Sequence, residues 1–238
     1  AVAQRLVRAK RSLQGERSAF VVPGDAELPA RLDDVLMVCY ALFTAGHLPT
    51  DDEAPLEATR SVEALRLVEM LRRWPPTAQP ATHALAALCW FTVARLPARV
   101  VDGALVPLDA QDRTRWDRRC LARGVAALRA SLSGPELTRY HVEAHLASLH
   151  SLAPSFDETP WEAVVRGYER LLTIAPSVSA HLARAVSLGH AGRHQEAMAA
   201  LAVASTTGAS STGTERPEWY ATAATLAMLR GSPAEAVL

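Results

Sequence analysis

Aromatic residues make up only 5% of this sequence, although 49% of it is hydrophobic. Alanine and leucine must therefore fill the interior, which suits closely packed helices better than strands, since strands favour β-branched and aromatic residues. The chain of 238 residues is long enough for one large domain or two small ones. Its net charge of zero excludes a general attraction of the whole molecule to nucleic acid.

Other absences narrow the class of protein further. The three cysteines, Cys39, Cys89 and Cys120, lack the spacing of a metal site, so we expect buried free thiols in a reducing cytoplasm. No apolar run is long enough to cross a membrane. No nucleophile–base–acid arrangement and no phosphate-binding glycine loop stands out, so we expect neither an enzyme nor a cofactor. The chain begins without Met, which indicates a fragment or a processed product.

Hydrophobic residues recur at helical spacing along nearly the whole chain. The spacing predicts helices over residues 31–45, 56–73, 80–95, 112–131, 137–150, 160–174, 177–191, 194–205 and 217–230. Residues 96–111 break the pattern, and Asp102-Gly103 between short apolar runs predicts a tight turn in a small hairpin. The sequence therefore predicts an all-α fold with one strand-like place.

The last third of the chain contains a repeat. When Gly192 is aligned with Gly231, Ala185 falls on Ala224, and small residues at such positions let the two helices of a hairpin approach closely. Residues 168–176 add a partial match that ends in proline. The pattern resembles a tetratricopeptide repeat, so we expect antiparallel helix pairs stacked in a repeat-like array.

Charge is segregated along the chain. Residues 1–17 contain five basic residues and one acid, whereas residues 25–63 contain nine acids and only two arginines, Arg31 and Arg60. The acidic stretch could be a solvated face, or it could contact the basic opening segment or another protein. A solvated face is the usual case. The alternative hypothesis is that the acidic stretch contacts the basic segment and regulates how available that segment is to DNA.

Three stretches together resemble one family. They are AVAQRLVRAKR (1–11), VPGDAELPARLDDVLMVCYALFTAGH (22–47) and RLPARVVDGALVPLDAQDRTRWD (95–117). In this order they resemble the extracytoplasmic-function sigma factors that carry a long, tetratricopeptide-like C-terminal extension. The stretch Phe43-Thr44-Ala45-Gly46-His47 departs from the family's usual Asn-Glu pair.

The resemblance implies a division of the chain. Residues 1–22 would be the end of region four, the last part of a helix-turn-helix, with a linker, and residues 23–238 would be the helical extension. Region two, which binds polymerase, and the first part of region four are absent from these residues. The implied partners of the intact protein are core RNA polymerase, promoter DNA and a regulatory protein, with no membrane. A free-standing helical-repeat scaffold without a DNA role is the alternative.

The resemblance also implies which residues meet DNA. They are Gln4, Arg5, Arg8, Lys10 and Arg11. Arginine suits guanine edges, and both basic types add phosphate affinity. On the residues alone, a solvated basic helix end is an equal interpretation. We expect weak DNA binding by this chain alone, because a helix without its scaffold is marginal.

A dense polar cluster follows the third predicted helix. It comprises Arg95, Arg99, Asp102, Asp109, Gln111, Asp112, Arg113, Arg115, Trp116, Asp117 and Arg118. We expect it to form a structural ion-pair network that fixes an irregular segment onto the helices, or else a site for a partner or effector. Elsewhere, His141 and His145 lie one turn apart, but their order with Glu143 is not that of a zinc protease, so we expect partly exposed helix histidines and no metal site.

Overall fold

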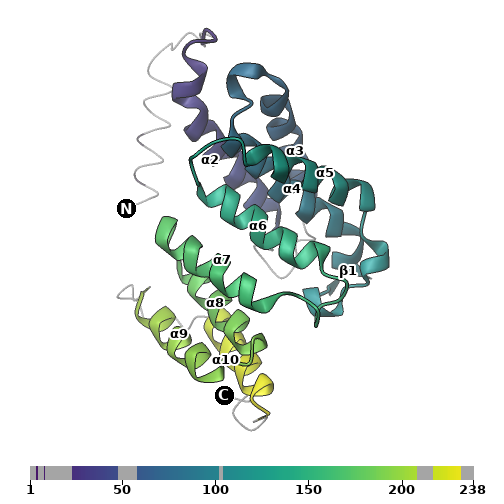
Figure 1. Cartoon of the computed structure of the whole chain (residues 1–238), viewed down its shortest axis with the longest axis vertical. Coiled ribbons are helices and arrows are strands. Elements are labelled where there is room, and N and C mark those ends of the chain that lie inside the picture. The colour runs from purple at the N-terminus through teal and green to yellow at the C-terminus, as the bar shows by residue number, and fades with distance from the viewer. Residues whose placement is uncertain are drawn as a thin grey trace.

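The fold is all-α in the part of the chain that the computed structural model describes, namely Gln4, Arg8 and residues 23–47, 58–101, 104–207 and 217–231. The α-helices in these ranges are α2 (Leu28–His47), α3 (Ala58–Arg73), α4 (Pro80–Arg99), α5 (Arg118–Ser131), α6 (Arg139–Leu152), α7 (Trp161–Ile174), α8 (Val178–His190), α9 (His194–Thr207) and α10 (Pro217–Leu229). Strands β1 (Val100–Val101) and β2 (Ala104–Leu105) form one antiparallel hairpin. Figure 1 shows the helices as two adjoining groups.

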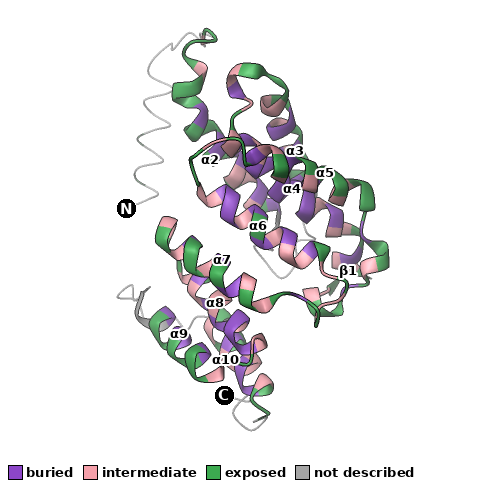
Figure 2. Ribbon diagram, in the orientation of Figure 1, coloured by how far each residue is buried: buried purple, intermediate pink, exposed green. Residues whose placement is uncertain are grey.

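The first group is built around α4. This helix packs against α2, α3, α5 and α6, and its side chains are buried on nearly every side (Figure 2). Phe91 is the largest fully buried side chain, and Leu36 of α2 and Leu85 of α4 are equally inaccessible. A helix that is apolar all round is stable only inside a protein, which explains why α4 occupies the centre.

The second group stacks helices as consecutive antiparallel pairs. α6 packs on α7, α7 on α8 and α8 on α9, and α10 then covers α8 and α9. Val142 and Leu146 of α6 belong to the core of this group, whereas Tyr140 and Ala144 of the same helix belong to the core around α4. α6 is therefore shared by both groups, as its position between them in Figure 1 shows.

The repeat turns have the backbone that the alignment of the two glycines requires. Gly192 follows α8 with a φ of 77°, and Gly231 follows α10 with a φ of 72°. The N–H of Arg193 donates to the carbonyl of Leu188 at 2.9 Å, the long-range bond of a Schellman helix end. Glycine adopts positive φ without steric cost, so both positions end a helix.

Most predicted helices are confirmed, and so is the hairpin around residues 102–103. Three boundaries were wrong. α4 continues to Arg99 and contains Pro97, the predicted helix from residue 112 begins only at Arg118, and the helix predicted to end at residue 45 continues to His47, so that Gly46 lies inside α2. A Cβ on Gly46 would lie 2.7 Å from the backbone nitrogen of Ser61, so this glycine permits close helix packing and does not end the helix. The proposed end of a helix-turn-helix lies outside the described residues, apart from Gln4 and Arg8, which are helical and exposed.

Gly124→Ala should destabilise the protein. A Cβ at Gly124 would lie 2.9 Å from Cε1 of the buried Phe91 ring, where α5 meets α4. Overpacking of this kind costs about 1–3 kcal/mol, against a gain of about 1 kcal/mol from replacing a helical glycine. Urea unfolding should therefore show a net loss. Gly24→Ala is the matched control, because a Cβ there meets nothing within 4 Å; equal stability of the two variants would contradict the packing argument.

Candidate functional site

The polar cluster at residues 95–118 forms the connection from α4 through the hairpin to α5. Three of its acids bond to backbone N–H groups: Asp109 to Ala110, Asp112 to Thr114, and Asp117 to Arg119 and Cys120. Asp117 is thereby the N-cap of α5, and its own backbone N–H donates to the carbonyl of Ala94 at 2.9 Å. These acids shape the segment locally. Asp102 lies outside the described residues.

Arg113 fastens this segment to the end of α6. Its Nη1 donates to the carbonyls of His150 and Ala153, each at 2.9 Å. These carbonyls belong to the last turn of α6 and to the residue that follows it, where helices leave acceptors unsatisfied. The guanidinium also lies over the ring of buried Trp116, with 4.5 Å from Cζ to the ring centroid. Arg113 therefore caps α6 and holds Trp116 in place.

Arg95 lies behind the same tryptophan. Its Nε donates to Oε1 of Gln111 at 3.4 Å, and Gln111 in turn donates to the carbonyl of Val106 at 2.9 Å. Burial, with Arg99 and Arg113 nearby, lowers the pKa of Arg95 to about 10. Burial also lowers the pKa of Arg99, and Arg115 and Arg118 are exposed.

The predicted ion-pair network is wrong for Arg95 and Arg113. Neither pairs with an acid in the described part of the chain. Arg95 bonds to the amide of Gln111, and Arg113 bonds to two carbonyls and lies over the Trp116 ring. The reason is that the three described acids of the segment accept from backbone N–H groups, as N-caps and turn residues do. The buried Nη2 of Arg113 and Nε1 of Trp116 are left without a protein acceptor among these residues.

The segment of residues 95–118, bonded to the end of α6, forms a joint between the two groups of helices. A group of aromatic rings extends this joint into the second group. The rings of Trp161 and His190 stack with centroids 4.3 Å apart, and His150 meets Trp161 edge-on at 5.5 Å. Phe156 closes the group by edge contacts with Trp161 and His190, each at 5.1 Å. The rings join the end of α6 to the start of α7 and the end of α8. Burial, helped by Arg95 and Arg113, lowers the pKa of His150 to about 4.

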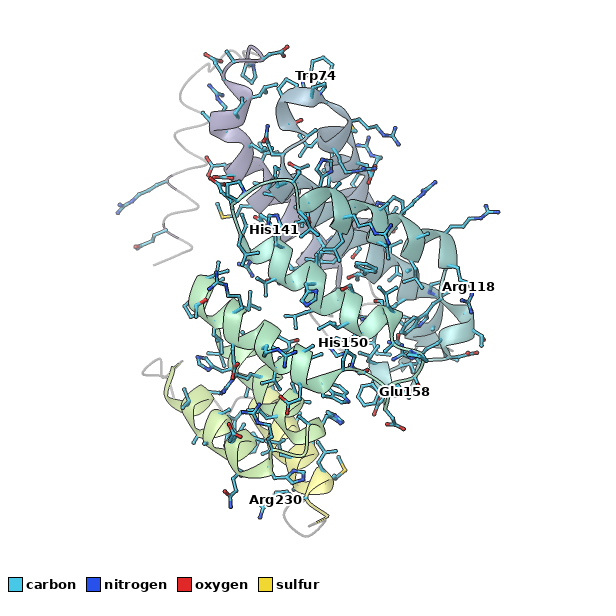
Figure 3. The ribbon with its side chains drawn as sticks, viewed as in Figure 1. Trp74, Arg118, His141, His150, Glu158 and Arg230 are labelled. Carbon is cyan, nitrogen blue, oxygen red and sulfur yellow. The ribbon has the colours of Figure 1, made fainter. Side chains whose placement is uncertain are left out.

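His141 differs from its prediction. Figure 3 places His141 and His150 at opposite ends of α6, and His141 is buried, not partly exposed. Its Nδ1 accepts from the backbone N–H of Thr138, and its Nε2 faces the carbonyl of Ser131 at 3.2 Å. The ring therefore completes the N-terminal cap of α6 in its neutral form. Across the described ranges no cluster of three or more ligating side chains could hold a metal ion.

The buried or partly buried positions of the three cysteines make their thiols unreactive. Cys39 and Cys89 are buried, Cys120 is partly buried, and all three are free. Burial raises the pKa of each thiol, that of Cys120 to about 11, so the nucleophilic thiolate is scarce at neutral pH. Among the described residues, the clustered side chains hold helices to one another.

The sequence did not reveal two surface depressions. A groove of about 400 Å³ lies between the end of α5, α6 and α7, and a second of about 380 Å³ lies between α2 and α3. The first groove could have been predicted from Leu132 and Leu137, which are apolar residues in a turn between two helices. The second could have been predicted from apolar residues such as Val38, which the core does not need. Of the residues predicted to contact DNA, Gln4 and Arg8 line neither groove, and Arg5, Lys10 and Arg11 lie outside the described residues.

Comparison with known proteins gives two matches. Residues 31–132 match a family of unknown function (DUF6596), which spans α2 to α5 with the polar segment. An uncharacterized protein of Rhizobium meliloti (strain 1021) is 30% identical over 189 residues, which are 79% of this chain and 44% of the relative. The chain thus spans under half the length of that relative. No solved structure matches. No helix within the described ranges is long and apolar enough to span a bilayer.

His150→Phe should reduce the acid sensitivity of the fold. The ordinary pKa of 6.5 applies when the chain unfolds, and the folded pKa is about 4. The unfolded state therefore takes up the proton first, so stability is full above pH 6.5 and declines down to about pH 4, by at most about 3 kcal/mol. Urea unfolding at pH 7.5 and 4.5 should show a smaller loss in the variant, which keeps a ring against Trp161. An unchanged loss would place the acid sensitivity elsewhere.

Arg113→Ala should loosen the joint. It removes both donated bonds to the end of α6 and the contact with Trp116, at a cost of about 2–3 kcal/mol in the free energy of unfolding. Arg115→Ala, two residues away at an exposed position, should change it by less than about 0.5 kcal/mol. Thermal or urea unfolding of both variants measures the difference, and similar losses would rule out a specific role for Arg113.

Proposed function

We propose that this chain is the C-terminal part of an alternative RNA polymerase sigma factor of the extracytoplasmic-function type, and that its helices form a regulatory, protein-binding extension. Three sequence stretches support the assignment by their resemblance to that family, and one of them, residues 95–117, builds the joint around Arg113 and Trp116. The relative's greater length is compatible with sigma regions in a longer protein. The intact protein would act in the cytoplasm with core RNA polymerase.

The observation that carries the proposal is the apolar surface on α2 and α3. Val38 is 68% exposed and Met70 56% exposed, and Val35 lies beside them along the groove between the two helices. Contiguous exposed apolar surface on a folded domain marks an interaction site. A body of packed helices that leaves such a surface uncovered is suited to bind another part of a larger protein.

Charge favours the promoter-reading part as the partner of the α2–α3 surface. Asp33 and Asp34 are exposed on α2 beside the apolar surface, and Asp34 lines the groove. The opening residues 1–17 are strongly basic, and the resemblance assigns DNA contacts to Gln4, Arg5, Arg8, Lys10 and Arg11. Contact between acids and these basic groups would compete with DNA phosphates for them. The extension would thereby regulate promoter binding.

Val38→Glu in the intact protein should therefore alter its activity as a sigma factor. The measurement is retention on immobilised core RNA polymerase, followed by transcription from a cognate promoter, with and without residues 23–238. A charge on the apolar surface should break the regulatory contact, so the variant should give the same promoter output as the truncated protein. Leu105→Glu makes the same change at an exposed apolar residue of the hairpin and should have no effect.

Two results would count against the proposal. An intact protein that does not bind core polymerase would favour the free-standing helical scaffold. Polymerase binding with identical behaviour of Val38→Glu, Leu105→Glu and wild type would leave the sigma assignment standing but remove the role of the α2–α3 surface.

A further inference from the structure

The groove between α5, α6 and α7 combines an apolar floor with a basic rim. Leu128, Leu132, Leu137 and Val142 supply apolar side chains, and Leu132 is 74% exposed. Its volume of about 400 Å³ is within the range of binding sites. Leu132 and Leu137 are both exposed and line the same groove, and apolar side chains that are exposed next to one another mark an interaction site.

Two arginines on the rim have no acidic partner within the part of the chain that the structure describes. Arg166 and Arg170 lie one turn apart on α7, line the groove and are exposed. Neither makes an ion pair or a side-chain hydrogen bond with the rest of the described chain, and no acidic residue lines the groove. Exposed His145 adds a polar group from α6.

The acidic residues of α6 and α7 pair with arginines outside the groove. Glu162 pairs with Arg193 at 3.2 Å, and Glu169 pairs with Arg184 at 2.9 Å, so the acids of α7 hold α8 and the turn that follows it. On α6, Glu143 pairs with Arg139 at 2.9 Å. The arginines that face the groove are therefore those left over when α7 packs on the next helices.

The wall of the groove is closely packed. A Cβ on Gly167 would lie 2.6 Å from Cδ2 of Leu146, so α6 and α7 are in close contact beneath the groove. On the other side, Nδ1 of His141 accepts from the backbone N–H of Thr138, and Nε2 of His141 lies 3.2 Å from the carbonyl oxygen of Ser131. A preformed site loses little entropy when it binds, so the groove suits a ligand of fixed shape.

We propose that this groove binds an amphipathic helix of a partner protein, one that carries carboxylates one turn apart beside leucine-like side chains. Arginines at positions i and i+4 lie about 5–6 Å apart at Cβ, the same spacing as acids at i and i+4 of a partner helix. Each guanidinium can bind one carboxylate with two hydrogen bonds. A fatty acid offers a single carboxylate and would leave one arginine unpaired, so the pair of arginines favours a peptide.

The test is selection of helical peptides on the immobilised 238-residue chain. The library fixes leucines on one helical face and varies the flanking positions among Glu, Gln and Lys. We expect enriched peptides to carry Glu one turn apart and to bind the chain with micromolar Kd in fluorescence anisotropy. Arg166→Glu with Arg170→Glu should weaken binding at least tenfold, and Lys-for-Glu versions of the peptides should recover it on that variant.

The matched control is Arg118→Glu with Arg119→Glu, which changes the charge equally at two exposed positions of α5 outside the groove. It should bind the selected peptides like wild type, and Leu132→Ser should bind them more weakly. The proposal is overturned if no peptide is enriched, if enriched peptides lack paired acids, or if both double variants bind equally. Binding of dodecanoate with the same arginine dependence, without peptide binding, would replace it with a lipid site. None of these results depends on polymerase binding.

Discussion

Burial of α6 on two faces is the constraint on which the rest of the structure depends. Tyr140 and Ala144 complete the core around α4, and Val142 and Leu146 begin the core of the stacked pairs. A helix with both faces covered cannot shift without opening two cores. Because its end is also capped by Arg113 from a distant segment, the two helical groups are held together by packing and directed hydrogen bonds.

The joint has an unusual charge arrangement that follows from this role. Arginines at buried positions are ordinarily paired with acids. Here the partly buried Arg95 and Arg113 instead contact an amide, carbonyls and the Trp116 ring, while the described acids nearby cap turns and α5. Carbonyl acceptors at a helix end and a tryptophan face both favour a cation. The segment between α4 and α5 is thus bonded to the end of α6.

The uncovered surfaces lie on this rigid frame. The α2–α3 surface is apolar with acids beside it, and the α5–α7 groove is apolar with arginines on its rim. The two surfaces are similarly apolar but have opposite charges beside them, so they would select different partners, since electrostatic complementarity acts mainly on specificity. In the proposed functions, the α2–α3 surface binds another part of a longer protein, and the α5–α7 groove binds a helix of a separate protein.

The sequence by itself determined the all-α class, the helix order, the hairpin and the repeat turns, since hydrophobic period, Asp-Gly and positive-φ glycines act locally. It could not show that Arg113 reaches the end of α6, that His141 closes a helix cap, or that Arg166 and Arg170 have no acidic partner among the described residues. Those outcomes depend on which side chains meet across many residues of chain. Only tertiary packing decides that, because it allocates each acid to one partner and leaves the remaining charges for the surface.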